Sequence, residues 1–359
     1  MTPASTSGTS SSPAPWWRKA LRYVIPLVIT VGLCYVLFTG INLGEIVDII
    51  RRDCNFWWIG LGLVISIFSH IFRAMRWGIQ LRALNVHASL WWLTLSVFGT
   101  YAVNLVFPRL GEVWRPGFIA ERQHAPFTTV FGSMVADRLA DTLTVLCLTV
   151  ITFLLASPAL LAFLERYPEV YQGIVKAIHS PFVWAAAVIC IAGIWWFLRH
   201  KSDNRVVLKI KEFVNGLWQG FIVLFRMKGR GRWLLLTVAI WGCYYLQLYV
   251  AFFAFPFTRE VLAEHGALAV LVCFVLSSIA MGIPANGGIG PWQIAVIFGL
   301  SIYMPSAIGP EGAEMFKVNS TAFANLVLGC QTLMVILLGI FTFTCISIDK
   351  RRHIRRIHQ

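Results

Sequence analysis

The charged side chains between residues 104 and 141 are the groups in this sequence that could do chemistry. They stand between two apolar segments, in the stretch NLVFPRLGEVWRPGFIAERQHAPFTTVFGSMVADRLAD. A charge near hydrocarbon costs about 2.5–3.5 kcal/mol on insertion scales unless it is paired or faces a cavity. We therefore expect the protein to use some of these eight groups: Arg109, Glu112, Arg115, Glu121, Arg122, Asp137, Arg138 and Asp141.

The segment PRLGEVWR predicts a site for a lipid phosphate. On a helix, Arg109, Glu112 and Arg115 would be spaced i, i+3 and i+6, so Glu112 could pair with either arginine. Two guanidinium groups around one carboxylate leave N–H donors free, and an arginine fork suits phosphate. The alternative is an ion-pair staple that holds a helical hairpin together. We expect Asn104 to bond the backbone near the turn of that hairpin.

Asp137 and Asp141 lie one helical turn apart, with Arg138 beside both, about two turns into an apolar segment. A solvent-exposed face explains such a position poorly. We expect the two carboxylates to face the same cavity as Arg109 and Arg115, where they bind a cationic headgroup or pair with those arginines. The alternative is that Arg138 and Asp141 only neutralise the hairpin.

Two further segments are weaker signals. In GIPANGGIGPWQ, Gly287, Gly288 and Gly290 allow backbone conformations closed to other residues, and a helix that starts after them would offer free N–H groups to an anion. A plain extracellular loop would have a similar composition. Arg73 and Arg76 close the second apolar span, where we interpret them as interfacial anchors, with phosphate contact at a cavity edge as the alternative.

The composition assigns these groups to an integral membrane protein. The chain is 58% hydrophobic and 13% charged, whereas soluble domains carry about 25% charge. The net charge of +14 comes from basic residues between and after apolar segments, which favours cytoplasmic loops over nucleic-acid binding. We find no CxxC, HExxH, Walker or nucleophile-elbow pattern, so we expect no metal, no cofactor and no enzymatic activity.

The apolar segments predict an all-α polytopic fold. Six segments approach or exceed the roughly 20 residues that a span needs: 21–39, 56–80, 127–156, 182–198, 233–256 and 319–346. Three are shorter or interrupted: 90–107, 267–283 and 292–304. We expect residues 1–17 to be a disordered tail, residues 18–348 to be the transmembrane domain and residues 349–359 to be a basic cytoplasmic tail.

The basic residues orient these segments. The loop 199–232 and the C-terminal tail are rich in Lys and Arg, which predicts that they and the N-terminus are cytoplasmic. The count of crossings then requires residues 90–125 to enter and return on the cytoplasmic side, and 267–304 to do so from outside. Such oppositely oriented re-entrant hairpins are typical of inverted-repeat transporters. The alternative is eight full spans, in which 267–283 and 292–304 cross separately and the first pair is still re-entrant. Within the basic loop, residues 206–227 could form an interfacial helix.

Four motifs together resemble the lysylphosphatidylglycerol synthase transmembrane (flippase-domain) family over roughly residues 20–346. They are R-x-x-R-W at Arg73–Trp77, N-x-x-x-P-R-x-G-E-x-x-R at Asn104–Arg115, R-x-x-D at Arg138–Asp141 and P-x-x-G-G-x-G at Pro284–Gly290. The resemblance implies a lipid translocase for aminoacylated phosphatidylglycerol. Because the sequence ends at Gln359, we expect the aminoacyl-transferase domain to be absent. Gln293 stands where many relatives carry Glu. If that Glu handles a cation or a proton, this protein would differ from them in how transport is coupled or in its substrate.

These observations predict an inner-membrane flippase-like transporter of anionic or aminoacylated phospholipid. The headgroup would move through a charged groove between the two hairpins, with Asn104, Arg138, Gly287, Gly288, Gly290 and Gln293 among its contacts. One alternative is a membrane enzyme or accessory subunit for lipid-linked substrates, with Glu112 or Asp141 as acid or base. Another is a proton-coupled carrier of a small solute. The sequence leaves open whether the protein is a homo-oligomer.

Overall fold

The computed structural model describes residues 43–182, 227–305 and 309–357, together with a few positions between 184 and 193. The spans predicted at 21–39 and 182–198 and the interfacial helix predicted at 206–227 lie wholly or mostly outside these residues. The described part of the chain contains α-helices and one 3₁₀ turn, as predicted for a polytopic membrane protein.

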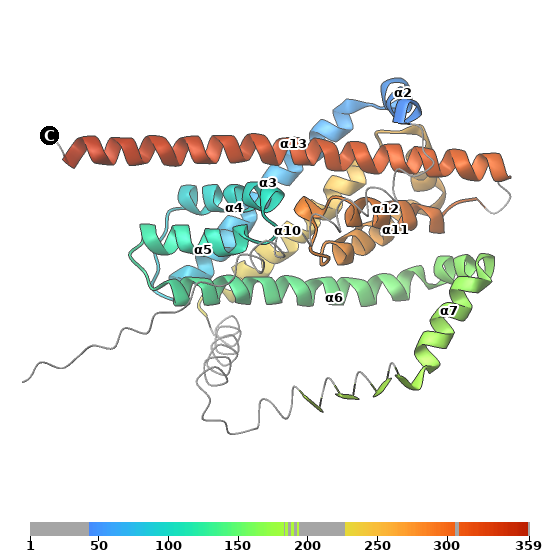
Figure 1. The fold of residues 1–359 in the computed structure, drawn as a ribbon, viewed down its shortest axis with the longest axis horizontal. Helices are drawn as coiled ribbons and strands as arrows, with labels where there is room; N and C mark the ends of the chain where they lie inside the picture. The colour runs from blue at the N-terminus through green and yellow to red at the C-terminus, as the bar shows by residue number, and fades with distance from the viewer. Residues whose placement is uncertain are drawn as a thin grey trace, which may run out of the picture.

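Two long helices frame the molecule on opposite sides: α6, Phe127–Arg166, and α13, Pro310–Ile357 (Figure 1). Between them cross α3, Phe56–Ala83, and α10, Arg230–Ala251, which pack closely against each other. These four helices and α11, Pro256–Ala280, are candidate membrane spans by length and apolar composition, although α11 is interrupted at Gly266. The described residues therefore contain five candidate membrane spans.

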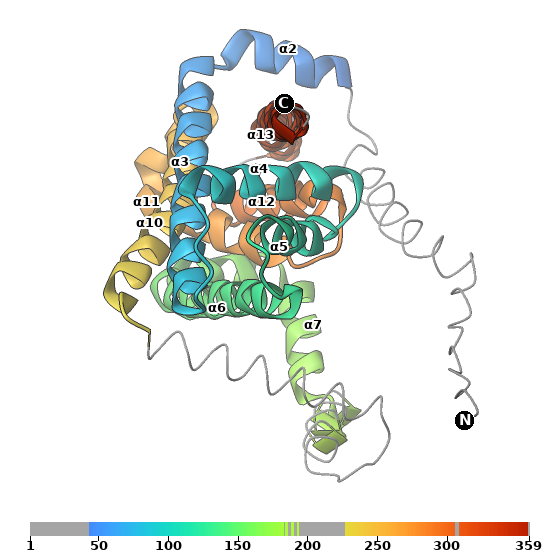
Figure 2. The ribbon, with the colours of Figure 1, turned by 90° about the vertical axis from the view of Figure 1, so that its left-hand side faces the viewer.

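Two shorter helices border this framework. The helix α2, Leu43–Asp53, lies beside α13 (Figure 2). Its Ile46 and Ile49 are buried, while Asp48, Arg51 and Arg52 are exposed, so one face packs and the other is polar. The helix α7, Pro168–His179, follows α6 directly.

The long helices extend beyond the predicted spans. The span predicted at 127–156 belongs to a helix that ends at Arg166, and the span predicted at 319–346 belongs to a helix that runs from Pro310 to Ile357. Hydropathy marks only the length that needs hydrocarbon. The α-helix continues further because the residues that follow, such as Glu, Lys and Arg, are good helix formers.

The predicted first hairpin is a pair of packed helices. The helix α4, Leu90–Val106, and the helix α5, Gly111–Arg122, are joined by a turn at residues 107–110. The Asn104 side chain accepts a hydrogen bond from the Gly111 backbone N–H at 2.8 Å, as predicted. A Cβ at Gly111 would collide with the Thr100 carbonyl oxygen, so only glycine permits this close approach of α4 and α5.

The second predicted hairpin also exists as a packed pair, but its first helix starts earlier than predicted. The helix α11 begins at Pro256 and is interrupted at Gly266, where φ is 65°. The part after Gly266 corresponds to the predicted segment 267–283. The 3₁₀ turn η1, Asn286–Gly288, then leads to α12, Pro291–Ile302.

The tips of the two hairpins contact each other through residues that are exposed or partly exposed. The pairs α4–α5 and α11–α12 occupy opposite halves of the view in Figure 1. At their junction the Arg109 guanidinium donates a hydrogen bond to the Gly282 carbonyl. Leu105 lies against Gly287, which has a φ of 61° and no room for a Cβ. The chain therefore brings two breaks in helical structure, far apart in sequence, to one place.

Candidate functional site

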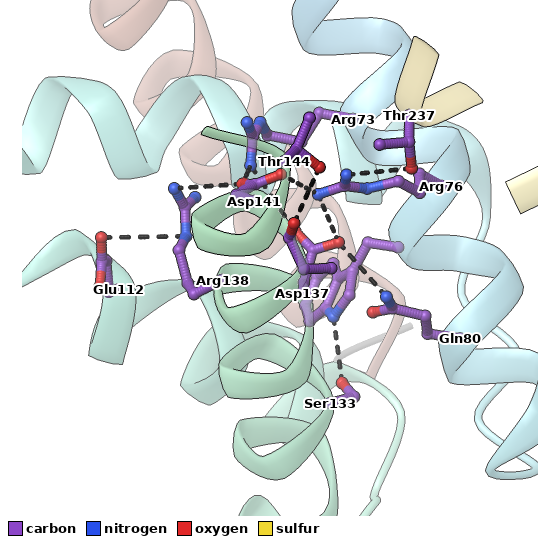
Figure 3. A network of polar contacts seen from close by, with 12 residues as sticks. Arg73, Arg76, Gln80, Glu112, Ser133, Asp137, Arg138, Asp141, Thr144 and Thr237 are labelled. Carbon is purple, nitrogen blue, oxygen red and sulfur yellow. Dashed lines mark hydrogen bonds and ion pairs between the residues drawn. The ribbon is translucent and has the colours of Figure 1, made fainter. Parts of the chain in front are cut away.

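Four charged side chains form a compact cluster between α3 and α6 (Figure 3). Asp141 accepts hydrogen bonds from Arg73 at 2.6 Å and from Arg76 at 2.7 Å. Asp137, one helical turn earlier, lies 2.8 Å from Arg76 and 3.6 Å from Arg73. Each carboxylate therefore faces both guanidinium groups. We call Arg73, Arg76, Asp137 and Asp141 the quartet.

The quartet is deeply buried. Arg76 and Asp137 are fully inaccessible, and Asp141, at 8%, is the most exposed of the four residues. Asp137 stands ten residues after Phe127, about 15 Å along α6 at 1.5 Å per residue. This part of α6 belongs to a helix long and apolar enough to cross a membrane. Charges in such a segment persist only when they are paired, and the quartet provides that pairing.

Neutral polar groups add hydrogen bonds to the quartet, although Arg76 Nε and Asp137 Oδ2 have no hydrogen-bond partner. Thr237 on α10 accepts a hydrogen bond from Arg76 at 3.3 Å. Tyr244, also on α10, accepts one from Arg73 at 3.3 Å, and its hydroxyl lies 3.4 Å from that of Tyr101 on α4. The cluster thereby connects α3, α4, α6 and α10.

Arg115 on α5 is buried beside the quartet and has a different environment. Its relative exposure is 1%, and none of its three guanidinium nitrogens has a hydrogen-bond partner. The guanidinium lies 4.0 Å from the centre of the Trp77 ring, a cation–π contact, and Trp77 is fixed by a 3.0 Å hydrogen bond to Ser133. A planar cation with unused donors can bind a phosphate or carboxylate in two places at once.

A looser pair lies at the edge of this cluster. Arg138 is 3.9 Å from Glu112 on α5 and 3.8 Å from Asp141. About a third of each of the Arg138 and Glu112 side chains is exposed. The site therefore consists of a buried quartet and a partly exposed rim, which is formed by Arg138 and Glu112.

The helical spacing predicted for PRLGEVWR is wrong. Arg109 has a φ of 61° and precedes α5, which begins at Gly111, so Arg109, Glu112 and Arg115 do not share one helix face. Pro108 lies in the turn between α4 and α5. Glu112 approaches Arg138 and pairs with neither predicted arginine. The sharp turn between α4 and α5 overrides the periodicity.

The predicted pairing of Asp137 and Asp141 with Arg109 and Arg115 is also wrong, whereas the alternative contact between Arg138 and Asp141 is present at 3.8 Å. Asp137 and Asp141 pair with Arg73 and Arg76, and neither forms an ion pair with Arg109 or Arg115. Arg73 and Arg76 are interior residues and cannot be interfacial anchors. Their position near the end of the second span suggested the interface, but α3 continues to Ala83, so both lie inside the membrane segment.

The glycine-rich turn holds its own helix start. Gly287, Gly288 and Gly290 all have positive φ, as the sequence predicted for this turn. The side chain of Gln293 accepts a hydrogen bond from the Gly290 N–H and donates one to Asn325 on α13 at 3.0 Å. One backbone donor that was expected to face an anion is therefore occupied within the protein, and Gln293 ties the second hairpin to α13.

Several residues of the site escaped the sequence reasoning. Trp77, Tyr244 and Thr237 contact the charged groups, and Tyr101 contacts Tyr244. His70 lies nearby, with its ring 4.6 Å from that of Tyr101. One signal was available: polar or aromatic residues recur every three or four positions along α3. The series is Ser66, Ser69, His70, Arg73, Arg76, Trp77 and Gln80, all of them buried.

Comparisons with known proteins agree with this membrane architecture. A family model for the lysylphosphatidylglycerol synthase TM region matches residues 23–343. The chain is also similar to a protein named Glycosyltransferase AglD from Haloferax volcanii, at 27% identity over 139 residues. That match covers 36% of this chain and 22% of the relative. No solved structure matches the chain. Because the family model covers most of the sequence, the chain belongs to the family of the lysylphosphatidylglycerol synthase TM region.

Proposed function

We propose that this protein is a lipid flippase-like transporter that moves the headgroup of an anionic or aminoacylated phospholipid between leaflets. The observation that carries the proposal is Arg115, a buried guanidinium with no hydrogen-bond partner. An uncompensated charge in the interior costs several kcal/mol. A protein that keeps such a group has a use for it, and a transient phosphate ligand would complete its coordination.

The charge balance of the site supports an anionic ligand. Four guanidinium groups, those of Arg73, Arg76, Arg115 and Arg138, stand against three carboxylates, those of Asp137, Asp141 and Glu112. Four minus three leaves one positive charge, which one phosphodiester would neutralise. The partly exposed Glu112 at the rim could receive the ammonium group of an aminoacylated headgroup.

The helix lengths support two re-entrant hairpins in place of eight full spans. The helices α5 and α12 have 12 residues each, about 18 Å at 1.5 Å per residue, and cannot cross a hydrocarbon layer of about 30 Å. After its break at Gly266, α11 retains 14 residues, about 21 Å. We therefore assign α4–α5 and α11–α12 to hairpins that enter from opposite sides, an arrangement compatible with an inverted repeat.

The basic residues support cytoplasmic termini in an inner membrane. The end of α3 and the start of α10 lie on the side of the molecule that carries the C-terminus (Figure 1). Arg82, Arg232, Lys350 and Arg351 belong to these ends. Since positively charged residues favour the cytoplasm, this side is assigned to it. The headgroup would then pass the junction of the two hairpin tips while the acyl chains remain in the bilayer.

The proposal is tested by reconstitution in liposomes. Headgroup-labelled phosphatidylglycerol or its lysyl derivative is added, and the fraction reached by a membrane-impermeant quencher is followed over time. We expect protein-dependent exposure of the label that is lost in Arg115→Gln and retained in Arg82→Gln, an exposed arginine on α3. Equal exposure with both variants would contradict the assignment of Arg115 to the path. Elution as a monodisperse species shows that each variant is folded.

A second candidate function is a membrane subunit or enzyme for lipid-linked substrates. It is favoured by the name of the relative from Haloferax volcanii, which is a glycosyltransferase, although the match covers 22% of that protein. In that case Glu112 or Asp141 would act as a general acid or base. Covalent turnover of a lipid-linked sugar by the purified protein, lost in Glu112→Gln, would favour this function over transport.

A further inference from the structure

A groove separate from the charged site runs between α4 and α13. It has a volume of about 800 Å³, within the range of ligand-binding pockets. Its walls are largely apolar, and six of its lining residues are Ala102, Leu105, Val106, Ile289, Ile340 and Phe343. None of them belongs to the quartet or contacts Arg115, so the groove is a second feature of the fold.

The length of the groove along α13 is close to the thickness of the hydrocarbon layer, which is about 30 Å. Its lining residues on α13 run from Thr332 to Arg351, which are 19 residues apart and therefore about 28 Å apart along the helix. At the inner end it includes Leu105, which lies against Gly287 where the two hairpin tips meet. The groove thus connects the level of the hairpin junction with one face of the membrane.

Polarity changes along the groove. Thr344 and Ser347 each donate a hydrogen bond to the carbonyl four residues earlier on α13, so their hydroxyls are satisfied by the helix and present mainly methyl and methylene surface. Among the described residues that line the groove, Arg351 is the charged one, and it stands at the end of the groove. An apolar groove with a cation at one end is complementary to a phospholipid that has an apolar acyl chain and an anionic headgroup.

We propose that this groove holds an acyl chain of an anionic phospholipid whose phosphate faces Arg351. The inference rests on the proposed function and deepens it, because it names the leaflet and the flank of α13 from which the lipid reaches the hairpin junction. The acyl chain of the lipid lies along α13, between α4 and the second hairpin. The headgroup stands on the assigned cytoplasmic side before it moves inward.

The competing occupant is the apolar segment 21–39 of this chain, which lies outside the described residues. Charge favours the lipid. Arg18 and Lys19 precede that segment and Arg22 lies at its start, so with both termini on the cytoplasmic side they would stand beside Lys350 and Arg351. Like charges would then meet at the end of the groove, whereas a lipid phosphate would neutralise Arg351.

A photoreactive benzoylphenylalanine in place of Thr344 identifies the occupant. Thr344 is exposed, so the change requires no repacking of the core. The full-length protein is reconstituted in vesicles of phosphatidylglycerol and phosphatidylethanolamine, irradiated and analysed by mass spectrometry. The matched control carries the probe at Leu337, which is 58% exposed on α13 and does not line the groove.

We expect the probe at position 344 to form adducts enriched in phosphatidylglycerol over its share of the vesicle, and the probe at 337 to report the vesicle composition. Adding Arg351→Gln should remove the enrichment at 344. A crosslink from position 344 to a peptide from residues 21–39 would overturn the proposal, since the chain itself would fill the groove. Adducts that match the vesicle composition at both positions would also overturn it.

The same vesicles separate this inference from the transport function. Enriched adducts in a protein that does not expose the headgroup label would support the groove and contradict the transporter. Label exposure without enrichment at position 344 would support the transporter and contradict the groove. An independent test fills the groove with a larger side chain. Thr344→Trp should abolish adducts with photoreactive acyl chains, whereas Leu337→Trp should leave these adducts unchanged.

Discussion

Two arginine environments lie side by side in this protein. In the quartet, Arg73 and Arg76 each face two carboxylates at 2.6–3.6 Å. Arg115, equally buried, has an aromatic ring on one side and no hydrogen-bond partner. All three residues are buried arginines, but two are paired with carboxylates and the third has no hydrogen-bond acceptor. The quartet is an ion-paired unit that joins α3 to α6, whereas Arg115 is buried with no hydrogen-bond acceptor on its guanidinium group.

The difference separates stability from function. A buried ion pair is hard to break, because removal of one partner leaves an uncompensated charge. A buried charge that lacks a partner already carries that cost, so its removal should stabilise the protein. Groups of the second kind occur where strain serves binding or catalysis. Substitutions can therefore test whether the two environments differ in energy as they do in geometry.

The largest effect is expected for Asp141→Asn, which breaks the quartet. Arg73 and Arg76 would then share Asp137 alone, and the free energy of unfolding should fall by about 3–5 kcal/mol. Thermal or denaturant unfolding in detergent micelles measures the change. The control is Asp48→Asn on the exposed face of α2, which should alter stability little. If the two variants unfold alike, the quartet does not hold α3 to α6.

Arg115→Met should act in the opposite direction. Replacement of an unpaired buried charge by an apolar side chain of similar length should raise the free energy of unfolding, on the order of 1–4 kcal/mol, and abolish lipid exposure in liposomes. Arg115→Lys keeps the charge and should not be stabilised. A destabilised Arg115→Met protein would instead show that the contact with Trp77 is structural, since cation–π contacts are worth about 2 kcal/mol when desolvated.

Gly111→Ala tests the packing that places Arg115. The added methyl group would collide with the Thr100 carbonyl and separate α4 from α5, so we expect a loss of about 1–3 kcal/mol in the free energy of unfolding. Gly132→Ala on α6 is the matched control. It has open space around the new Cβ and should gain up to about 1 kcal/mol from helix propensity. Equal losses at both positions would contradict the close approach of α4 and α5.

The smallest effect is expected at Arg122, which provides an exposed comparison. Arg122 forms a 2.6 Å ion pair with Asp349 on α13 and lies over the Trp92 ring. Because both partners are partly exposed, a double-mutant cycle with Arg122→Gln and Asp349→Asn should give a coupling of about 0.2–1 kcal/mol that falls with added salt. A coupling as large as the loss in Asp141→Asn would mean that burial does not distinguish these arginines.

Much of the fold could be predicted from the sequence because membrane insertion leaves a strong local signal. The spans at α3, α6, α10 and α13 follow from apolar length, and both interrupted hairpins follow from Pro and Gly between short apolar segments. The hydrogen bond from Gly111 to Asn104 was also predictable, since the two residues flank one turn. Such features depend on neighbours in the sequence.

The partners within the site were less predictable. Charges clustered in sequence from Arg109 to Asp141 suggested that they pair with one another, yet Asp137 and Asp141 bond arginines more than 60 positions earlier. Arg109 does not belong to the helix expected for it, because it lies in the turn with a positive φ. Sequence spacing describes one helix face, and it does not determine which other helix that face contacts.

The sequence by itself determined the class of protein, the apolar spans, the two interrupted segments and the set of charges that must lie within or near the membrane. These follow from the cost of placing polar groups and unsatisfied backbone in hydrocarbon, which acts on each segment separately. Only the tertiary structure decided that Arg73 and Arg76 are neutralised while Arg115 is not. That choice depends on how α3, α5 and α6 pack, and a buried charge has no preferred partner until packing brings one within a few ångströms.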